Sequence, residues 1–467
     1  MKRLREKKQI DHPFEREVCL IRRRRPEILA VFLGTLLALA GSARAQNPAW
    51  FQAGTGLGDV SKPRLAVADF VPREDHTKPH SQLFTQVVRD DLQFSGIIEL
   101  VSPSFYPTQV PSVPGELKNN TWTDASVNAN LVAFGNLTES SEVAIQAWLY
   151  DVKNPASQAV IGKVYRGAPT DAQVRKFAHQ FADEIISKLS GGLPGIASTQ
   201  IAFVSSRTGT KEIWVMDYDG ANQHPVTSLH TISLTPRWSP DASRIAFTCF
   251  APAHGVVSPQ ICMYSVDANK VVTFPRYRGT NSSPAWSPDG SHLMFSSSML
   301  GNPELFLTDA SGSTPKRLTF ANGASTSPAW NPKTGQSVVF VSDRGGIPKL
   351  FMMNADGTNS AEIDLPDKGY LIDPSWAPNG QILAFSWRRP EGNYDIYVMD
   401  ASTHQLVELT RDSARNERPS WAPDGRHIVF ESTRGGSRQI WTMLADGSQA
   451  RQLTTQGHNE SPNWSPR

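Results

Sequence analysis

A tryptophan-centred phrase recurs six times between residues 236 and 466 and constrains the fold more than any other feature of this chain. Each copy has one proline two residues before the tryptophan and another two residues after it. Successive tryptophans lie 43–48 residues apart, at Trp238, Trp286, Trp330, Trp376, Trp421 and Trp464. A repeat of this period is typical of arrays in which each copy is one supersecondary unit.

Each repeat also predicts four short strands. A pair such as Asp289-Gly290 often follows the phrase and suits a tight turn. An apolar strand with a conspicuous phenylalanine comes next, at Phe203, Phe247, Phe295, Phe340, Phe385 and Phe430. Third strands such as Ile213–Asp217 and fourth strands such as Leu409-Thr410 follow. Four strands in about 45 residues indicate one blade of a β-propeller.

The phase of the repeat predicts how the array ends. It opens at Ile201 on a second strand and finishes at Trp464 on a first strand, so the last sequence supplies what the first blade lacks. We therefore expect an all-β six-bladed propeller over residues 201–467, closed by the C-terminal strand. Closure hides two sheet edges. An open β-solenoid is the alternative, but it would not need complementary fragments at its two ends.

Residues 63–190 have no such repeat and are expected to form an N-terminal α/β domain. Its predicted strands are residues 64–70, 97–101, 131–137, 143–150 and 159–165. A helix is expected over His80–Gln93, with apolar positions on one face at Phe84, Val87, Val88 and Leu92. A second begins at Thr170, where Gln173 completes a capping box. Its apolar stripe is Val174, Phe177, Ala178, Phe181, Ile185 and Leu189. The glycine-rich residues 191–200 form the expected linker.

The first 45 residues are typical of an export signal. A basic block, Arg22–Arg25, precedes an apolar run, Ile28–Ala40, and Ala43-Arg44-Ala45 suits cleavage near Ala45. The run is shorter than the roughly 20 residues that span a bilayer. Whether export uses the general or the twin-arginine route stays open. We expect a periplasmic protein with a flexible mature N-terminus at residues 46–62.

The net charge argues against nucleic-acid binding, and the two cysteines of the mature chain leave a disulfide open. The chain carries +2 overall, and removing the basic leader leaves −4, so nothing indicates nucleic-acid binding. Cys249 and Cys262 flank a predicted hairpin. In an oxidising compartment they could form a disulfide. Equally, they could be two buried small residues on opposite faces of the sheet.

No catalytic or metal-binding pattern stands out. The Gly-x-Ser-x-Gly elbow of hydrolases is absent from the sequence. Gly54–Gly58 resembles a phosphate loop but follows no predicted strand. Asp75, His76 and His80 could be metal ligands, although a solvated loop explains them better. Turns explain the repeated Asp-Gly pairs better than calcium does. We expect no enzyme activity, no cofactor and no metal.

Together the leader, the α/β domain and the six blades resemble the TolB family over nearly the whole mature chain. Val174–Leu189 leading into Ile201–Val204, and Phe274-Pro275-Arg276, carry the resemblance most specifically. It implies a periplasmic, monomeric protein of the Tol-Pal system, which supports outer-membrane integrity and constriction during division. The implied partners are the lipoprotein Pal, over the propeller, and TolA, through the mature N-terminus. Gln46–Phe51, however, departs from the usual family pattern.

The partner site is expected at one mouth of the central channel, because the first strand of each blade lines that channel. The predicted mouth residues precede each phrase: Asn281, Ser282, Ser283, Ser325, Thr326, Ser327, Leu371, Ile372, Asp373, Asn416, Glu417, Arg418, Asn459, Glu460 and Ser461. Tyr277 and Arg278 add residue types enriched at interface hot spots.

Two other functions stay open: a propeller-associated hydrolase, and a periplasmic propeller that recognises sugars or cell-wall fragments. The second would need an aromatic-rich channel mouth, whereas the predicted mouth is mainly polar.

Overall fold

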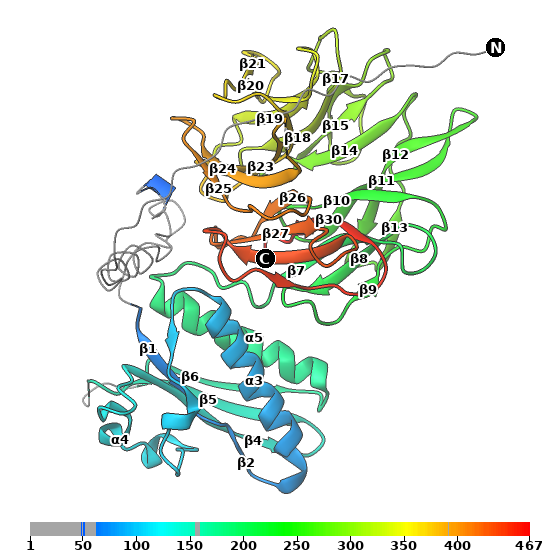
Figure 1. Ribbon diagram of the computed structural model, residues 1–467. Coiled ribbons are helices and arrows are strands. Elements are labelled where there is room, and N and C mark those ends of the chain that lie inside the picture. Colours follow the sequence, from blue (N-terminus) through cyan, green and yellow to red (C-terminus); the bar gives the residue numbers. More distant parts are fainter. Residues whose placement is uncertain (1–47, 49, 52–61, 155–158, 391) are drawn as a thin grey trace, which may run out of the picture. The chain divides into compact units, whose positions relative to one another are not determined.

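The computed structural model describes residues 48, 50, 51, 62–154, 159–390 and 392–467 (Figure 1). The predicted export signal, the glycine-rich Gly54–Gly58 and most of the predicted flexible N-terminus lie outside these ranges. The smaller domain contains one mixed sheet of order β3-β1-β4-β5-β6, with β2 pairing to β4. Its strands are β1 Arg64–Val67, β2 Val71–Pro72, β3 Glu99–Leu100, β4 Leu131–Glu139, β5 Val143–Asp151 and β6 Ile161–Gly167.

The first strand is shorter than the predicted residues 64–70. Val67 pairs with Ala133, but Val71 pairs with Asn136, so the chain from β1 to β2 has one residue more than β4 opposite it. That extra residue interrupts the ladder, as a bulge does. Phe70 lies in the interruption and is buried.

Two helices, α3 Lys78–Phe94 and α5 Asp171–Leu189, lie side by side against the sheet (Figure 1). The predicted apolar stripes are buried, including Phe84, Val88 and Phe181 in one shared cluster. Thr170 accepts a hydrogen bond from the Gln173 backbone amide, which confirms Thr170 as the N-cap. The Thr170 amide donates to the Ala168 carbonyl rather than to the Gln173 side chain, so the reciprocal bond of the predicted capping box is not formed. Three 3-10 turns and a short helix complete the domain: η1 Asp75–Thr77, η2 Pro103–Phe105, η3 Pro114–Glu116 and α4 Asn119–Thr123.

Six four-stranded antiparallel sheets form the propeller, as predicted. The strands of blade 1 are β30 Asn459–Trp464, β7 Gln200–Ser205, β8 Glu212–Asp217 and β9 His224–Pro225. Those of blade 2 are β10 Ser233–Trp238, β11 Arg244–Ala253, β12 Val256–Ser265 and β13 Lys270–Val272. Those of blade 3 are β14 Asn281–Trp286, β15 His292–Ser297, β16 Glu304–Asp309 and β17 Lys316–Arg317.

The other three blades repeat the pattern. Blade 4 contains β18 Ser325–Trp330, β19 Ser337–Ser342, β20 Lys349–Asn354 and β21 Ala361–Glu362. Blade 5 contains β22 Tyr370–Trp376, β23 Ile382–Arg388, β24 Tyr394–Asp400 and β25 Leu406–Glu408. Blade 6 contains β26 Asn416–Trp421, β27 His427–Ser432, β28 Gln439–Leu444 and β29 Arg451–Gln452. The six repeat phenylalanines are wholly buried.

Blade 1 combines strands from the two ends of the array. Strand β30, red in Figure 1, pairs antiparallel with β7, and Trp464 lies opposite Ile201. The Trp464 indole N–H donates to Thr199 Oγ1 at 2.7 Å, and the Ser465 amide donates to the Gln200 carbonyl at 2.8 Å. Each inner strand contacts the next around the ring, including β10 with β30. The predicted closure is confirmed.

The two cysteines form a disulfide between β11 and β12. Phe247 pairs with Cys262 and Cys249 pairs with Gln260, so the two cysteines are offset by two residues on one face of the sheet. The alternative of opposite faces is therefore wrong.

Buried polar contacts join the two domains, which belong to one compact unit, Asn47–Arg467. The Tyr218 hydroxyl of the propeller bonds Asp91 of α3, and Asp91 also bonds His179 of α5 at 2.7 Å. His427 Nε2 lies 2.8 Å from the Phe94 carbonyl oxygen, and Arg451 stacks on the Phe94 ring. The Tyr218 hydroxyl, the Asp91 carboxylate and the His427 ring are thus hydrogen-bonded within the interface, which offsets the cost of burying them.

A short piece of the expected flexible N-terminus is packed. Phe51 is wholly buried in a cluster with Ala384 of blade 5 and Phe430 of blade 6, and Trp50 packs against the same cluster.

Ring closure makes the stability of the propeller depend on its last nine residues. Deleting residues 459–467 should remove the inner strand of blade 1 and the buried Trp464, whose loss alone costs roughly 3–5 kcal/mol. We expect a large fall in melting temperature, measured by circular dichroism. Deleting only the exposed Arg467 is the matched control, and an unchanged melting curve for the longer deletion would contradict closure by β30.

Candidate partner-binding face

The strand registers define two ends of the propeller. In blade 2, Ser233 at the start of the inner strand pairs with Cys249, which pairs with Gln260 at the third strand. The start of each inner strand therefore shares one end with the loop between the second and third strands. We call this the mouth face. The tryptophans lie at the opposite end, because each finishes its inner strand.

A β-bulge shapes every inner strand at the same place. The register of all six inner strands shifts just before the proline of the phrase. The residue preceding that proline has φ between 48° and 56° in each case, the left-handed region that non-glycine residues seldom occupy. The six residues are Thr235, Ser283, Ser327, Asp373, Arg418 and Ser461. Bulges of this kind re-aim side chains.

Hydrogen bonds from the preceding blade hold three of these bulges. The Ser283 amide donates to Thr248 Oγ1, the Arg418 amide to Ser386 Oγ, and the Ser461 amide to Glu431 Oε2, at 2.8–3.2 Å. In each case the acceptor is on the second strand of the blade before. The bulge is therefore part of the contact between blades.

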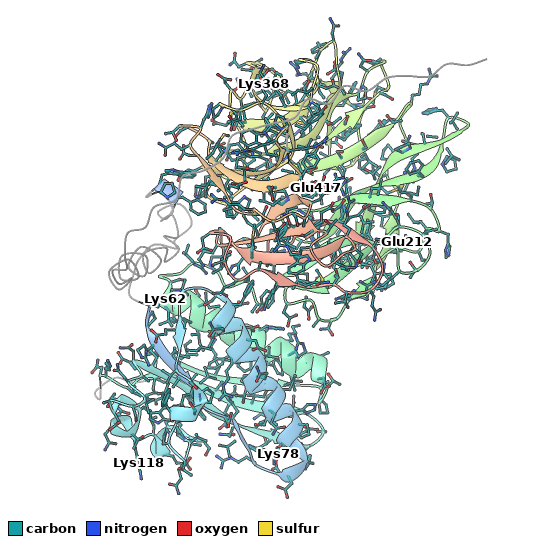
Figure 2. The ribbon with its side chains drawn as sticks, in the orientation of Figure 1. Lys62, Lys78, Lys118, Glu212, Lys368 and Glu417 are labelled. Carbon is teal, nitrogen blue, oxygen red and sulfur yellow. A yellow bond between two sulfur atoms is a disulfide. The ribbon has the colours of Figure 1, made fainter. Side chains whose placement is uncertain are left out.

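An ion network lies on blades 6 and 1 at the mouth face. Arg418 bonds Glu431 at 3.1 Å, Arg438 bonds Glu460 at 3.1 Å, and Arg415 grips Glu417 (labelled in Figure 2) through two nitrogens. Lys211 of blade 1 also pairs with Glu460.

The network hides its anions and presents its cations. The side chains of Lys211, Arg415, Arg418 and Arg438 are 29–47% exposed, whereas those of the three glutamates are 10% exposed or less. A protein approaching this side of the mouth face therefore meets positive charge.

The charged groups of this network also shift one another's pKa values. Burial lowers the pKa of Arg418, but Glu431 and Asp373 more than offset it, so that pKa lies above its usual value. Burial raises the pKa of Asp373 despite the attraction of Arg418. Arg418 therefore stays cationic.

Exposed apolar side chains are concentrated at the same end. Seven large apolar side chains are exposed among the described residues of the propeller. Six of them lie in mouth-face loops or at strand ends there: Ile232, Val256, Val257, Leu300, Phe320 and Tyr370. The seventh, Val266, follows β12 at the other end.

The opposite end of the channel holds a cavity of about 560 Å³. Its lining includes the six repeat tryptophans, the proline that follows each of them, and Pro194 of the linker. Arg237, Ser375, Ser420 and Asn463 add polar groups. Aromatic side chains therefore line the end of the channel opposite the mouth face, whereas the sugar-binding alternative predicted them at the mouth.

Other candidate chemistry is accounted for by local bonding. His80 pairs with Glu139 at 2.7 Å and with Asp171 at 3.2 Å. Ser239 and Ser243 donate to Asp241, lowering the pKa of that turn aspartate to about 2. Within the described ranges, no cluster of three His, Cys, Asp or Glu side chains is arranged to hold a metal ion. No helix in those ranges is long and apolar enough to cross a membrane.

Comparison with known proteins identifies the family. The family model for the TolB beta propeller domain matches residues 187–371 and 365–467, and that for the TolB amino-terminal domain matches residues 57–158. The chain belongs to the TolB family.

Relatives of this TolB family member support the assignment. It is 29% identical over 448 residues to the Tol-Pal system protein TolB of Bordetella pertussis, covering 94% of this chain and 96% of that one. It is 33% identical over 261 residues to the protein TolB homolog of Chlorobium chlorochromatii, or 56% of each chain. TolB from Acinetobacter baumannii shares the fold, with a TM-score of 0.72 and 24% identity over 87% of this chain and 98% of that one.

The predicted mouth residues of this TolB family member differ in exposure. The first residue of each predicted triplet is buried: Asn281, Ser325, Leu371, Asn416 and Asn459. Glu417, Glu460 and Ser461 are also buried, while Ser282, Ser283, Thr326, Ser327, Ile372, Asp373 and Arg418 are half-buried. The half-buried residues and the exposed cations of the ion network are therefore better placed to contact a partner than the buried residues are.

Tyr277 is committed to packing between blades. Its ring stacks on Phe295 at 5.4 Å, and its hydroxyl donates to the carbonyls of Gly312 and Ser313. Arg278 is exposed. Of this predicted pair, only Arg278 can be changed without removing a packing contact.

Sequence reasoning missed several residues of this face. The triplet of blade 2, Ser233–Thr235, was not among the predicted mouth residues. Nor were Lys211, Arg415 and Arg438, which reach the network from loops and neighbouring strands. The bulges could have been expected, since a proline inside a sheet is confined to edges or bulges.

The buried asparagines should serve stability rather than binding. Asn416 bonds Ser432 and Asp412, and Asn459 bonds Gln439 at 2.7 Å. We expect Asn416→Ala or Asn459→Ala to destabilise the protein by about 1–3 kcal/mol, because buried partners lose their bonds. Urea denaturation measures this. Ser282→Ala, at a half-buried position, is the control, and equal stability of all three variants would refute the assignment.

Proposed function

We propose that this chain is a non-catalytic periplasmic scaffold of the Tol-Pal system that binds Pal on its mouth face. It would connect Pal to inner-membrane Tol proteins, with TolA meeting the mature N-terminus. This role supports outer-membrane integrity and constriction during cell division. The names of the relatives, which are Tol-Pal system proteins, support the proposal.

One observation carries the choice of face: exposed cations and six of the seven exposed large apolar side chains lie at one end of the propeller. Aromatic side chains and arginine, represented here by Phe320, Tyr370 and Arg278, are enriched at protein interfaces.

The test changes cations that are exposed at the mouth face. Arg278→Glu and Lys211→Gln should each weaken binding of the soluble Pal domain by about 1–3 kcal/mol, the range expected for a hot-spot residue. Calorimetry measures the affinity, and melting curves check that both variants are folded.

Matched controls come from the α/β domain. Arg166→Glu and Lys163→Gln change exposed cations on β6, far along the chain from the mouth-face loops. They should bind like the wild type. Wild-type affinity in Arg278→Glu and Lys211→Gln would move the Pal site elsewhere.

The tryptophan-lined cavity favours a second candidate function, recognition of a sugar or cell-wall fragment. A cavity of this size accommodates a small ligand. Its aromatic lining is the feature that recognition of a sugar would need. Because six tryptophans surround it, occupancy should change the intrinsic fluorescence. We expect soluble peptidoglycan fragments to leave the spectrum unchanged if Pal binding is the whole function. A saturable change that Ser375→Leu, at a half-buried position of the lining, abolishes would establish the second function instead.

A further inference from the structure

Blade 2 carries a hairpin that the other blades lack. Its second and third strands, β11 and β12, have ten residues each, whereas the corresponding strands of the other blades have six or seven. Cys249 pairs with Ser233, the first residue of the inner strand, and the ladder continues from Cys249 to the pair Ala253–Val256. Residues 250–259 therefore extend beyond the blade on the mouth face. We call them the arm.

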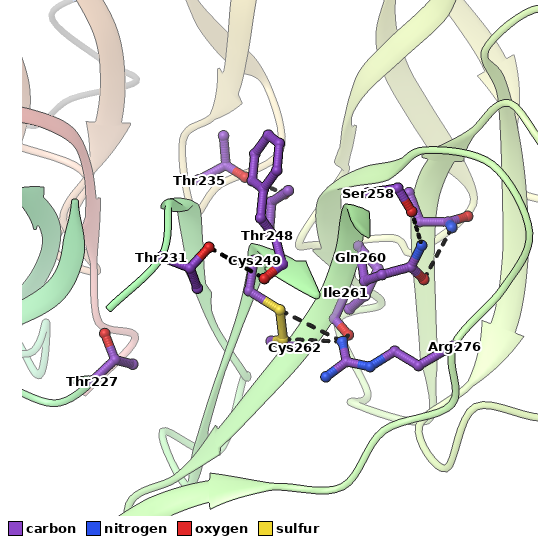
Figure 3. The surroundings of a disulfide bond; sticks show 12 residues. Thr227, Thr231, Thr235, Thr248, Cys249, Ser258, Gln260, Ile261, Cys262 and Arg276 are labelled. Atoms are coloured by element: carbon purple, nitrogen blue, oxygen red, sulfur yellow. Dashed lines mark hydrogen bonds between the residues drawn. A yellow bond between two sulfur atoms is a disulfide. The ribbon is translucent and has the colours of Figure 1, made fainter. Parts of the chain in front are cut away.

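A covalent bond fastens the arm at its base. The Cys249–Cys262 disulfide joins the two strands where the arm leaves the blade, with the Cα atoms 5.9 Å apart (Figure 3). Arg276 covers the disulfide and donates to the Ile261 carbonyl and to Cys262 Sγ, both at 3.1 Å. A two-stranded hairpin alone is marginally stable in water. The disulfide therefore keeps β11 and β12 paired at the base of the arm, so that opening of the hairpin does not spread into blade 2.

The arm presents apolar side chains to solvent. Val256 and Val257 are each 64% exposed at its tip. The Phe250 amide donates to the Ile232 carbonyl, which ties the arm to the loop that carries another exposed apolar side chain. Leu300, 66% exposed, lies in the loop between β15 and β16 of blade 3, and Phe320, 77% exposed, lies in the loop that connects blade 3 to blade 4; both loops are on the mouth face.

The charge pattern indicates what covers this surface. The cations of the ion network belong to blades 6 and 1, and Arg278 lies between blades 2 and 3. The exposed apolar side chains belong mainly to blades 2 and 3 and to the loop that follows blade 3. Both groups are on one end of one ring. A single occupant that satisfies both is a folded protein domain with an acidic patch beside an apolar patch. A like copy of the propeller would bring cations against cations, which is costly.

We propose that the disulfide-braced arm is a second contact for the protein domain bound at the channel mouth, and that the brace sets its affinity. This inference rests on the proposed function. A rigid arm loses less conformational entropy on binding than a frayed one. The apolar tip would supply burial, while the cations of blades 6 and 1 supply orientation.

The test uses the mature protein and the soluble Pal domain. The double variant Val256→Asp/Val257→Asp should bind about tenfold or more weakly, as expected when hot-spot side chains are lost. Its melting temperature should be unchanged, because both side chains are exposed. Val164→Asp, at an exposed valine of β6, is the matched control. Wild-type affinity in the double variant overturns the inference.

A second variant tests the brace. Cys249→Ser/Cys262→Ser should also weaken Pal binding and speed hydrogen exchange of residues 250–259. Faster exchange with wild-type affinity would overturn the role of the brace; if the variant does not fold, the valine pair still decides the arm.

Two further outcomes separate the arm from the mouth. If Arg278→Glu and Lys211→Gln weaken binding but the valine pair does not, the proposed function stands and the arm fails. If the wild-type protein dimerises in sedimentation and the valine pair makes it monomeric, a second copy covers the arm, which also overturns the inference.

Discussion

The pairing of β30 with β7 is the constraint on which the rest of the propeller depends. It brings together residues 265 positions apart, Gln200 and Ser465, through two hydrogen bonds between them. Without it, β7 would have a bare edge and the channel would lose one of its six walls. Asn463 extends the closure to both neighbours, accepting from the Trp238 amide and donating to Ser420. Closing so long a loop costs entropy that these contacts must offset.

Periodicity made the architecture predictable. Each repeat places its tryptophan at the end of the inner strand and its phenylalanine in the second strand, so these positions predicted the number of blades and the closure of the ring. The helices of the α/β domain followed from stripes such as Phe84 to Leu92, which bury one face as expected. Features set by a single register were harder. The disulfide depends on an offset of two residues across one ladder, and spacing along the chain does not report that offset.

The candidate site was predictable only in outline. The residues just before each tryptophan phrase were correctly expected at the channel mouth. The sequence could not distinguish Asn416, which is wholly buried and hydrogen-bonded to Ser432, from the half-buried Arg418 two residues later. The ladder is regular through Glu417, and the bulge begins at Arg418, whose side chain bonds Glu431 while Asn416 bonds Ser432. Charge partners such as Glu431 and Arg438 come from other strands, so their pairing is a tertiary property. The length of the arm is likewise hard to predict, because it depends on how far the β11–β12 ladder continues beyond Cys249, which spacing along the chain does not report.

Placing the closing strand at the very end of the chain has a consequence for biosynthesis. A ribosome adding about 5–20 residues per second needs roughly 13–53 seconds to travel from Gln200 to Ser465. For that whole interval the strands β7 to β9 exist without their inner neighbour. Blade 1 is thus the first to be translated and the last to be completed, and the nascent chain carries an unsatisfied edge that a chaperone could hold.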